Sequence, residues 1–239
     1  MKRAHSGLPV SHVSRQPRAS FDESEWPATI PAIRQLLDDG LDLGPLTVLV
    51  GENGSGKSTL VEALAIQFGL SREGGSTGAM HSTRESESEL WKWLTLRRQP
   101  GASRWGFFLR AETMHGYYTY LEEHPGRDPA FHEMSHGESF VEVLRSRVDN
   151  PGLYLLDEPE SALSFTACLA LVGLLGDVAR SGTAQAVVAT HSPIIAATPG
   201  ATILELGPWG LREARWEELD LVQHWRAFLT DPQLYLRHL

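Results

Sequence analysis

The sequence predicts an α/β fold in which helices flank a mainly parallel sheet. Three short apolar runs, at residues 46–50, 153–156 and 186–189, are typical of buried parallel strands. A glycine-rich turn and a helix-like pattern at residues 59–66 directly follow the first run. We expect a small helical insertion at about residues 70–134, between the first helix and the second run.

The turn after the first run predicts a phosphate site. It matches G-x-x-x-x-G-K-[ST] between a strand and a helix, which is the context that this P-loop motif requires. Its glycines let backbone N–H groups turn inward around a phosphate, and the helix N-terminus adds partial positive charge. Lys57 is expected to reach the β- and γ-phosphates of a nucleoside triphosphate, and Ser58 to bind Mg²⁺. The predicted nucleotide-binding residues here are Gly51, Asn53, Gly54, Ser55, Gly56, Lys57, Ser58 and Thr59. The alternative is a glycine-rich turn that binds nothing, which the matching strand and helix disfavour.

Two adjacent carboxylates follow the second run. Asp157 and Glu158 emerge at its carboxyl end, where ligands bind in open α/β sheets. We expect Asp157 to hold the Mg²⁺ shell and Glu158 to orient and polarise an attacking water. Adjacent acids can also be simple turn residues, but the apolar run before them and Pro159 after them favour the functional role.

Two further segments carry possible phosphate contacts. His191 follows the third run between Thr190 and Ser192-Pro193, although a lone histidine at a strand end is ordinarily a solvated loop residue. Ser135 and Gly137 precede a helix-like run at residues 138–147. A serine hydroxyl and a glycine N–H that open a helix form an anion site, and a plain N-cap is the alternative.

Taken in order, these segments resemble the ABC-type ATPases over residues 26 to 206. They correspond to that family's P-loop, signature loop, Walker B strand, D-loop (residues 161–164) and switch histidine. The resemblance implies hydrolysis of ATP with Mg²⁺ by Lys57, Glu158 and His191, with His191 sensing the γ-phosphate. It also implies an ATP-dependent head-to-tail homodimer, in which Ser135 and Gly137 close on the γ-phosphate held by the opposite protomer. The signature loop is divergent, because His136 and Glu138 replace a glycine and a glutamine of the usual L-S-G-G-Q.

Two family positions stay open. Residues 105–112 predict a strand whose end carries no glutamine, where the family has its Q-loop glutamine. Glu112 is our candidate for this contact to Mg²⁺ or water, with Arg110 competing and a solvent-exposed acid as the alternative. Phe21 and Trp26 lie where the family has an aromatic residue that stacks on adenine, and either can equally be a core residue.

Composition indicates a globular chain. Of its 239 residues, 41% are hydrophobic and 21% charged, which predicts a single globular domain. Together with the resemblance, this implies a single ABC-type ATPase domain over residues 21–239. A net charge of −9 gives no support for a nucleic-acid groove. No apolar window reaches eighteen residues, so we expect no integral membrane segment and a cytoplasmic location. The single cysteine, Cys168, excludes an intramolecular disulfide, and its apolar surroundings predict a buried packing role.

The two ends and the insertion carry further expectations. Residues 1–20 predict a flexible arm, and residues 69–89 predict a flexible loop that leads into the insertion. Helix-like patterns appear at 90–96 and 117–123, but the insertion is too short for a long coiled coil. A hairpin is predicted from residue 201 to 214, followed by helices within residues 217–239.

Details of the motifs favour one branch of the family. Glu160 and Ser192 stand where transporter subunits usually have threonine and aspartate, and the motifs look like those of short stand-alone bacterial ATPases related to the overcoming-lysogenization-defect (OLD) proteins. Three functions remain open because a fold does not determine function. They are an ATP-hydrolysing switch that acts on an unknown protein partner, the energising subunit of a membrane transporter, and a non-hydrolysing ATP-gated scaffold.

Overall fold

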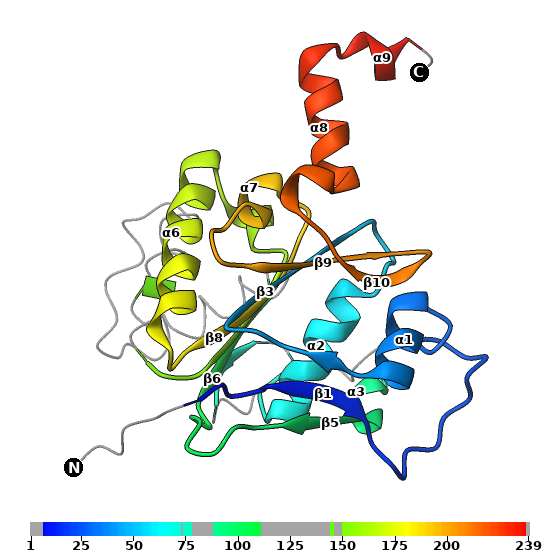
Figure 1. Cartoon of the computed structure of the whole chain (residues 1–239), viewed down its shortest axis with the longest axis vertical. Coiled ribbons are helices and arrows are strands. Elements are labelled where there is room, and N and C mark those ends of the chain that lie inside the picture. Colours follow the sequence, from blue (N-terminus) through cyan, green and yellow to red (C-terminus); the bar gives the residue numbers. More distant parts are fainter. Residues whose placement is uncertain (1–6, 73, 78–87, 111–143, 146–149, 238–239) are drawn as a thin grey trace, which may run out of the picture.

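The computed structural model describes residues 7–72, 74–77, 88–110, 144–145 and 150–237. Its centre is a seven-stranded sheet of order β10-β9-β3-β8-β7-β6-β4 (Figure 1). The five inner strands are parallel, and β10 and β4 are antiparallel edge strands. The strands are β3 (Leu46–Gly51), β4 (Gly75–Ser76), β6 (Gly106–Arg110), β7 (Leu153–Asp157), β8 (Gln185–Thr190), β9 (Thr202–Gly207) and β10 (Gly210–Glu213). This mainly parallel sheet, flanked by helices, confirms the predicted fold class.

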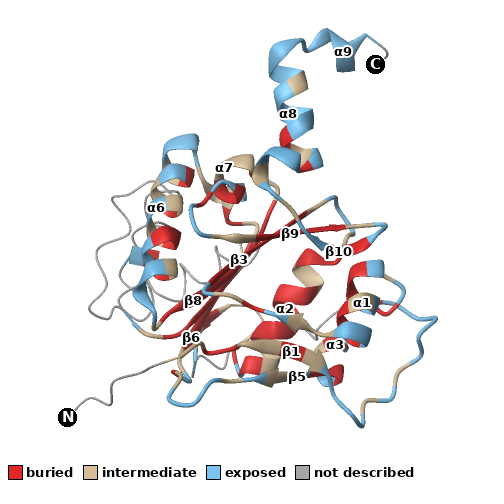
Figure 2. Ribbon diagram, in the orientation of Figure 1, coloured by how far each residue is buried: buried red, intermediate tan, exposed pale blue. Residues whose placement is uncertain are grey.

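The three predicted apolar runs form the middle of the sheet. They are β3, β7 and β8, and all residues of β7 and β8 are buried (Figure 2). Strand β3 pairs with β8 on one side and β9 on the other, and β7 pairs with β8 and β6. Because all five inner strands run parallel, their carboxyl ends meet at one edge of the sheet. Every predicted catalytic residue follows one of these ends.

Helices cover both faces of this sheet and create two hydrophobic cores. The first core packs α1 (Pro31–Asp39), α2 (Lys57–Phe68) and α3 (Leu90–Trp93) against one face. The second packs α6 (Phe165–Ser181) and α7 (Pro193–Ala196) against the other. Alternate residues of one strand serve opposite cores, as Val187 and Val188 of β8 do. Cys168 of α6 is buried in the second core, as its apolar surroundings predict.

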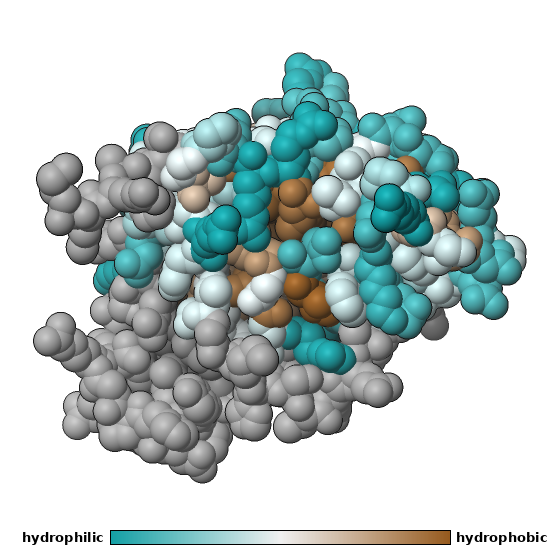
Figure 3. All heavy atoms as spheres, turned by 90° about the horizontal axis from the view of Figure 1, so that it is seen from below, coloured by the Kyte–Doolittle hydropathy of each residue, from teal (hydrophilic) through white to brown (hydrophobic). Residues whose placement is uncertain are grey.

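A second sheet lies beneath the first core. It has three antiparallel strands in the order β2-β1-β5, which are β1 (His12–Arg15), β2 (Leu41–Asp42) and β5 (Leu94–Arg97). This differs from the expected flexible arm at residues 1–20, because Val10 and Val13 are completely buried and anchor the segment. Residues 1–6 lie outside the described part. Figure 3 views the molecule from the side of β1 and β5 and shows apolar atoms at the centre of that face within a polar surround.

The last two helices of the C-terminal region extend away from the rest of the fold. Strands β9 and β10 form the antiparallel hairpin, followed by a 3₁₀ turn at Trp216–Glu218, α8 (Asp220–Thr230) and α9 (Gln233–Leu236). Helix α8 projects away from the sheet, and Val222 is its one buried residue (Figure 1). Among the described helices, none is long and apolar enough to cross a membrane.

The insertion is only partly described. Residues of the predicted helix at 90–96 divide between α3 and β5. The strand predicted at residues 105–112 forms as β6 up to Arg110. The predicted helix at 117–123, the signature loop and Glu112 lie outside the described residues.

Candidate nucleotide-binding site

The P-loop connects β3 to α2 at the carboxyl edge of the sheet. Gly54 and Gly56 have φ values of 77° and 99°, a left-handed region that favours glycine. A side chain at Gly51 would collide with the carbonyl oxygen of Leu206 on β9. The loop therefore keeps a tight backbone turn whose N–H groups can face a ligand. Helix α2 begins at Lys57, so its N-terminal dipole adds positive potential at the same point.

The Lys57 side chain folds back over this loop. Its Nζ donates hydrogen bonds to the carbonyl oxygens of Gly51, at 2.8 Å, and Glu52, at 3.1 Å. The residue is only 3% exposed. Burial lowers the pKa of Lys57, and the nearby carboxylates of Glu158, Asp157, Glu160 and Glu52 oppose that shift. The ammonium group thus lies desolvated among carboxylates, next to the turn that would hold a phosphate.

A second polar group of the loop lacks a partner. Ser55 Oγ is buried and makes no hydrogen bond within the described part of the chain. Buried hydroxyls are normally hydrogen-bonded, so Ser55 Oγ is suited to a hydrogen bond with a polar ligand atom. A phosphate oxygen fits, because the loop glycines, Lys57 and the helix N-terminus surround the same space.

Strand β7 delivers the predicted acidic pair. Asp157 is its last residue and is 3% exposed, and Glu158 follows it with a 39% exposed side chain. Glu158 adopts the left-handed conformation, at φ 49° and ψ 51°, and is the one non-glycine residue with positive φ among the described residues. Its N–H donates to the Ala189 carbonyl oxygen at 2.9 Å. Such strain in a non-glycine residue is concentrated at functional sites.

His191 stands beside Glu158, directly after β8. Its Nε2 lies 3.3 Å from Glu158 Oε1, within ion-pair distance but without hydrogen-bond geometry. The His191 N–H donates to Glu160 Oε1, which the sequence analysis did not predict. Glu160 therefore connects the turn after β7 to the end of β8. Ser192 caps α7 by accepting from the N–H groups of Ile194 and Ile195.

An ion-pair cluster joins the P-loop helix to the acidic pair. Arg110, at the end of β6, donates through Nη1 to Glu62 Oε2 of α2 at 2.8 Å. Its Nε lies 3.4 Å from Asp157 Oδ2. Arg110 was one candidate for this strand end, whereas Glu62 was not predicted. A charged residue among the apolar residues of α2, one helical turn after Ser58, was the available signal.

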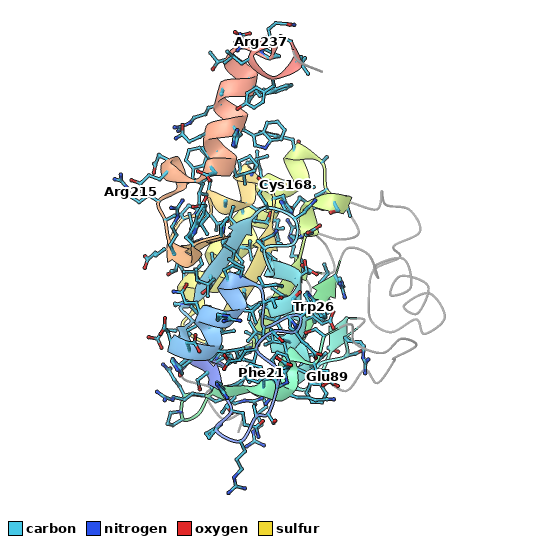
Figure 4. All side chains as sticks on the ribbon, turned by 90° about the vertical axis from the view of Figure 1, so that its right-hand side faces the viewer. Phe21, Trp26, Glu89, Cys168, Arg215 and Arg237 are labelled. Carbon is cyan, nitrogen blue, oxygen red and sulfur yellow. The ribbon has the colours of Figure 1, made fainter. Side chains whose placement is uncertain are left out.

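An open hollow of about 210 Å³ adjoins the P-loop. Residues from three segments line it, namely Trp26, Ile30, Asn53, Gly54, Gly56, Lys57, Ser58, Thr59 and Glu158. Trp26 is 50% exposed there, whereas Phe21 stacks on Trp93 with ring centroids 4.4 Å apart and contacts Arg15. Figure 4 places Phe21 level with Glu89, at the start of α3, and Trp26 nearer the middle of the body. Trp26 is thus available to a ligand, and Phe21 packs.

The polar residues fit a metal held largely by phosphates. Within the described ranges, no group of three or more His, Cys, Asp or Glu residues could hold an ion. Magnesium ordinarily binds through one or two protein oxygens together with substrate phosphates. Ser58, at the start of α2, and Asp157 could supply those oxygens. Of the predicted site residues, Glu112, Ser135 and Gly137 lie outside the described part, and the others gather at this edge.

Comparisons with known proteins give a family and several relatives for this chain. The family model described as "ABC transporter" matches residues 37–161. The aliphatic sulfonates import ATP-binding protein SsuB 2 of Rhodococcus jostii (strain RHA1) is 32% identical over 165 residues, which are 64% of this chain and 65% of the relative. The corresponding SsuB of Delftia acidovorans is 33% identical over 173 residues, 66% of this chain and 68% of that protein. The chain thus spans about two thirds of the length of these curated relatives.

Similar solved structures include a metal-chelate type ABC transporter in an inward-facing conformation. It has a TM-score of 0.48 and 16% identity, with 93% of this chain and 89% of that one covered. The dimeric bacterial ABC transporter cassette MJ0796 has a TM-score of 0.39 and 15% identity, over 75% of this chain and 90% of the cassette. The family match covers more than half of the sequence, and the Delftia relative is matched over two thirds of its length. This chain therefore belongs to the ABC transporter family.

Proposed function

We propose that this protein binds ATP with Mg²⁺ and hydrolyses it, and that nucleotide binding closes a head-to-tail homodimer. The observation that carries the proposal is the meeting of Lys57, Asp157, Glu158 and His191 at one sheet edge beside a P-loop with an orphan hydroxyl. These are the groups that phosphoryl transfer uses: a cation for the phosphates, a metal ligand, and a carboxylate for water.

Each residue has a distinct task in this proposal. The P-loop N–H groups and Lys57 bind the β- and γ-phosphates, and Ser58 and Asp157 hold the cation. When bound, Mg²⁺ neutralises charge on the phosphate oxygens. Glu158 accepts a hydrogen bond from the attacking water, whose oxygen bonds to the γ-phosphorus as the bond to the bridging oxygen of ADP breaks. In this proposal His191, whose Nε2 lies 3.3 Å from Glu158 Oε1, contacts the γ-phosphate. Trp26 is the proposed stacking partner of adenine.

The partner protomer supplies the remaining contacts in this proposal. Ser135 and Gly137 of the signature loop would bind the γ-phosphate held by the other protomer. Support comes from the order of the motifs and from family membership. Glu112 remains a predicted contact to Mg²⁺ or water.

The first experiment compares the wild type with Glu158→Gln. We expect a slow wild-type ATPase and at least a 100-fold loss of phosphate release in the variant, because the amide cannot polarise water as a carboxylate does. Light scattering with Mg·ATP should show a stable dimer for Glu158→Gln, since the nucleotide that joins the protomers is no longer consumed.

Glu213→Gln provides the matched control. Glu213 is an exposed carboxylate at the end of β10, so its amide variant should behave as the wild type. A wild type that releases no phosphate and stays monomeric with Mg·ATP would contradict the proposal. Hydrolysis that is unaffected by Glu158→Gln would remove Glu158 from the mechanism.

Within the family, we propose the stand-alone branch that resembles the OLD-like ATPases. Glu160 supports this placement, because it occupies the usual threonine position of transporter subunits and binds the His191 N–H. The alternative is an energising subunit of a membrane transporter, which the names of both curated relatives favour. Neighbouring genes for membrane-spanning proteins that co-purify with this chain would decide for the transporter. A non-hydrolysing scaffold is the third candidate, and the phosphate-release assay tests it.

A further inference from the structure

Arg110 occupies a special place in the sheet. The parallel pairing of β6 with β7 sets Arg110 in register with Asp157, so the two residues end neighbouring strands at the same height. The side chains of parallel strands in register lie on the same face. The positive charge of Arg110 therefore lies next to Asp157, the carboxylate that the proposed function assigns to the metal.

Glu62 anchors this cation from the other side. It lies on α2 one helical turn after Ser58, so both residues share one face of the helix. Glu62 Oε2 accepts from Arg110 Nη1 at 2.8 Å, a shorter distance than the 3.4 Å between Arg110 Nε and Asp157 Oδ2. Arg110 thus bridges the P-loop helix and the acidic strand.

Burial strengthens the electrostatic interactions among Glu62, Arg110 and Asp157. The side chains of Glu62, Asp157 and Arg110 are 9%, 4% and 22% exposed. Charges in such surroundings interact more strongly than charges in water, because little solvent screens them. Arg110 offsets the repulsion between two buried carboxylates, and its positive charge also acts on any cation that approaches Asp157.

We propose that Arg110 is a positioning residue that holds the Asp157 carboxylate and sets its affinity for a divalent cation. Glu62 controls how much of the Arg110 charge Asp157 receives. This inference rests on the proposed ATPase function. It predicts opposite effects from two neighbouring substitutions, because Arg110 carries the charge that opposes a cation and Glu62 carries the charge that compensates Arg110.

Binding of Mn²⁺, followed by electron paramagnetic resonance, tests this directly. The protein is titrated with Mn²⁺ in the presence of a non-hydrolysable ATP analogue, and the protein-bound signal gives the half-saturating concentration. We expect Arg110→Met to lower that concentration about tenfold and Glu62→Gln to raise it by a similar factor. The double variant Glu62→Gln/Arg110→Met removes one charge of each sign, so its half-saturating concentration should lie between those of the two single variants.

Hydrolysis supplies a second readout. Arg110→Met should bind the cation more tightly and still release phosphate more slowly, because Asp157 has lost a contact that orients it. A purely structural role for Arg110 would weaken cation binding and hydrolysis together. Arg212→Met is the matched control, since Arg212 also pairs with a buried carboxylate, Glu205, on the far side of the sheet.

The outcomes separate this inference from the proposed function. A wild type that binds no Mn²⁺ with the nucleotide analogue overturns both. A wild type that binds, together with variants that share its half-saturating concentration or shift it in the same direction, overturns the role of Arg110 alone. If Arg110→Met does not fold, Glu62→Gln carries the test, because its amide has the same shape and still accepts from Arg110.

Discussion

The two ends of β8 differ in whether the buried polar groups around them have hydrogen-bond partners. At the first residue, the completely buried Gln185 side chain has a full set of partners: the Val10 N–H at 2.9 Å and the carbonyl oxygens of Val10, at 2.6 Å, and Gly44, at 2.9 Å. Around the other end, Ser55 Oγ, Glu160 Oε2 and His191 Nε2 are buried without a hydrogen-bond partner in the described structure. Strand β8 thus runs from a region whose buried polar groups are hydrogen-bonded to a region where several are not.

This difference separates stability from function. Satisfied buried groups stabilise a unique packing, whereas orphan groups destabilise the free protein and are retained where a ligand completes them. The strained Glu158 backbone lies at the unsatisfied end. Within the described residues, Thr47 Oγ1 on β3 is also buried without a hydrogen-bond partner.

Among the variants at the carboxyl end of β8, Lys57→Met should cause the largest loss of activity. Loss of the ammonium removes its phosphate contact, and we expect kcat/KM for ATP to fall about a thousandfold. The ligand-free variant should nevertheless be at least as stable as the wild type, because burial disfavours the charged lysine. Phosphate release and thermal unfolding measure the two effects, with Lys92→Met as an exposed control.

The same substitution predicts a pH dependence. The folded-state pKa of Lys57 is lowered, so the unfolded chain binds more protons between that value and the ordinary value of 10.5. Wild-type stability should therefore gain from this residue as pH rises through that window. Lys57→Met lacks this gain, and urea unfolding of both proteins at several alkaline pH values would show their stabilities converging. A gap that widens with pH would contradict this sign.

Gln185→Ala should remove the hydrogen bonds at the first residue of β8 and lower the stability of the protein. It leaves the polar groups of Val10 and Gly44 buried without partners and opens a cavity, which destabilises the protein by about 3 kcal/mol. Urea unfolding measures this effect, and nucleotide affinity of the folded fraction should stay unchanged. Gln16→Ala, at an exposed position, is the control. A comparable loss in Gln16→Ala would show that the effect is not specific to the buried amide.

Ser55→Ala sharpens the comparison at a single atom. Nucleotide affinity should fall about tenfold, while the free protein keeps its stability, since an unsatisfied hydroxyl is removed. Ser181→Ala is the converse control, because Ser181 Oγ donates to the Val178 carbonyl oxygen at 2.8 Å and accepts from Ala184. It should lose stability and keep nucleotide affinity. Calorimetric titration and thermal unfolding give both quantities for both variants.

Glu158→Gly addresses the smallest expected effect. Glycine adopts the left-handed conformation without a steric penalty, so this variant should be about 1 kcal/mol more stable than Glu158→Ala. Both variants lack the carboxylate, so the difference between them reports the relief of backbone strain less the greater conformational entropy of glycine in the unfolded chain. A Glu158→Gly variant that is less stable than Glu158→Ala would mean that the strain at residue 158 is negligible.

Sequence reasoning reached much of the site because its residues act locally. The P-loop, the acidic pair and His191 each lie within or directly after an apolar run, and parallel strands bring such ends together. Arg110 and Glu62 were harder to pair, since 48 residues separate them and their contact depends on the packing of α2 against β6. The packing of residues 7–20 was also missed, because two buried valines in a polar stretch are a weak signal.

The sequence by itself determined the α/β class, the glycine-rich turn after β3 and the acidic and histidine residues at the strand ends, because those depend on short-range patterns. Only the tertiary structure decided that Trp26 is free for a ligand while Phe21 packs on Trp93, and that Gln185 anchors the N-terminal segment. It also decided that Arg110 stands between Glu62 and Asp157. These features depend on which segments, far apart in the sequence, pack against one another. Burial of apolar surface over the whole chain determines that packing.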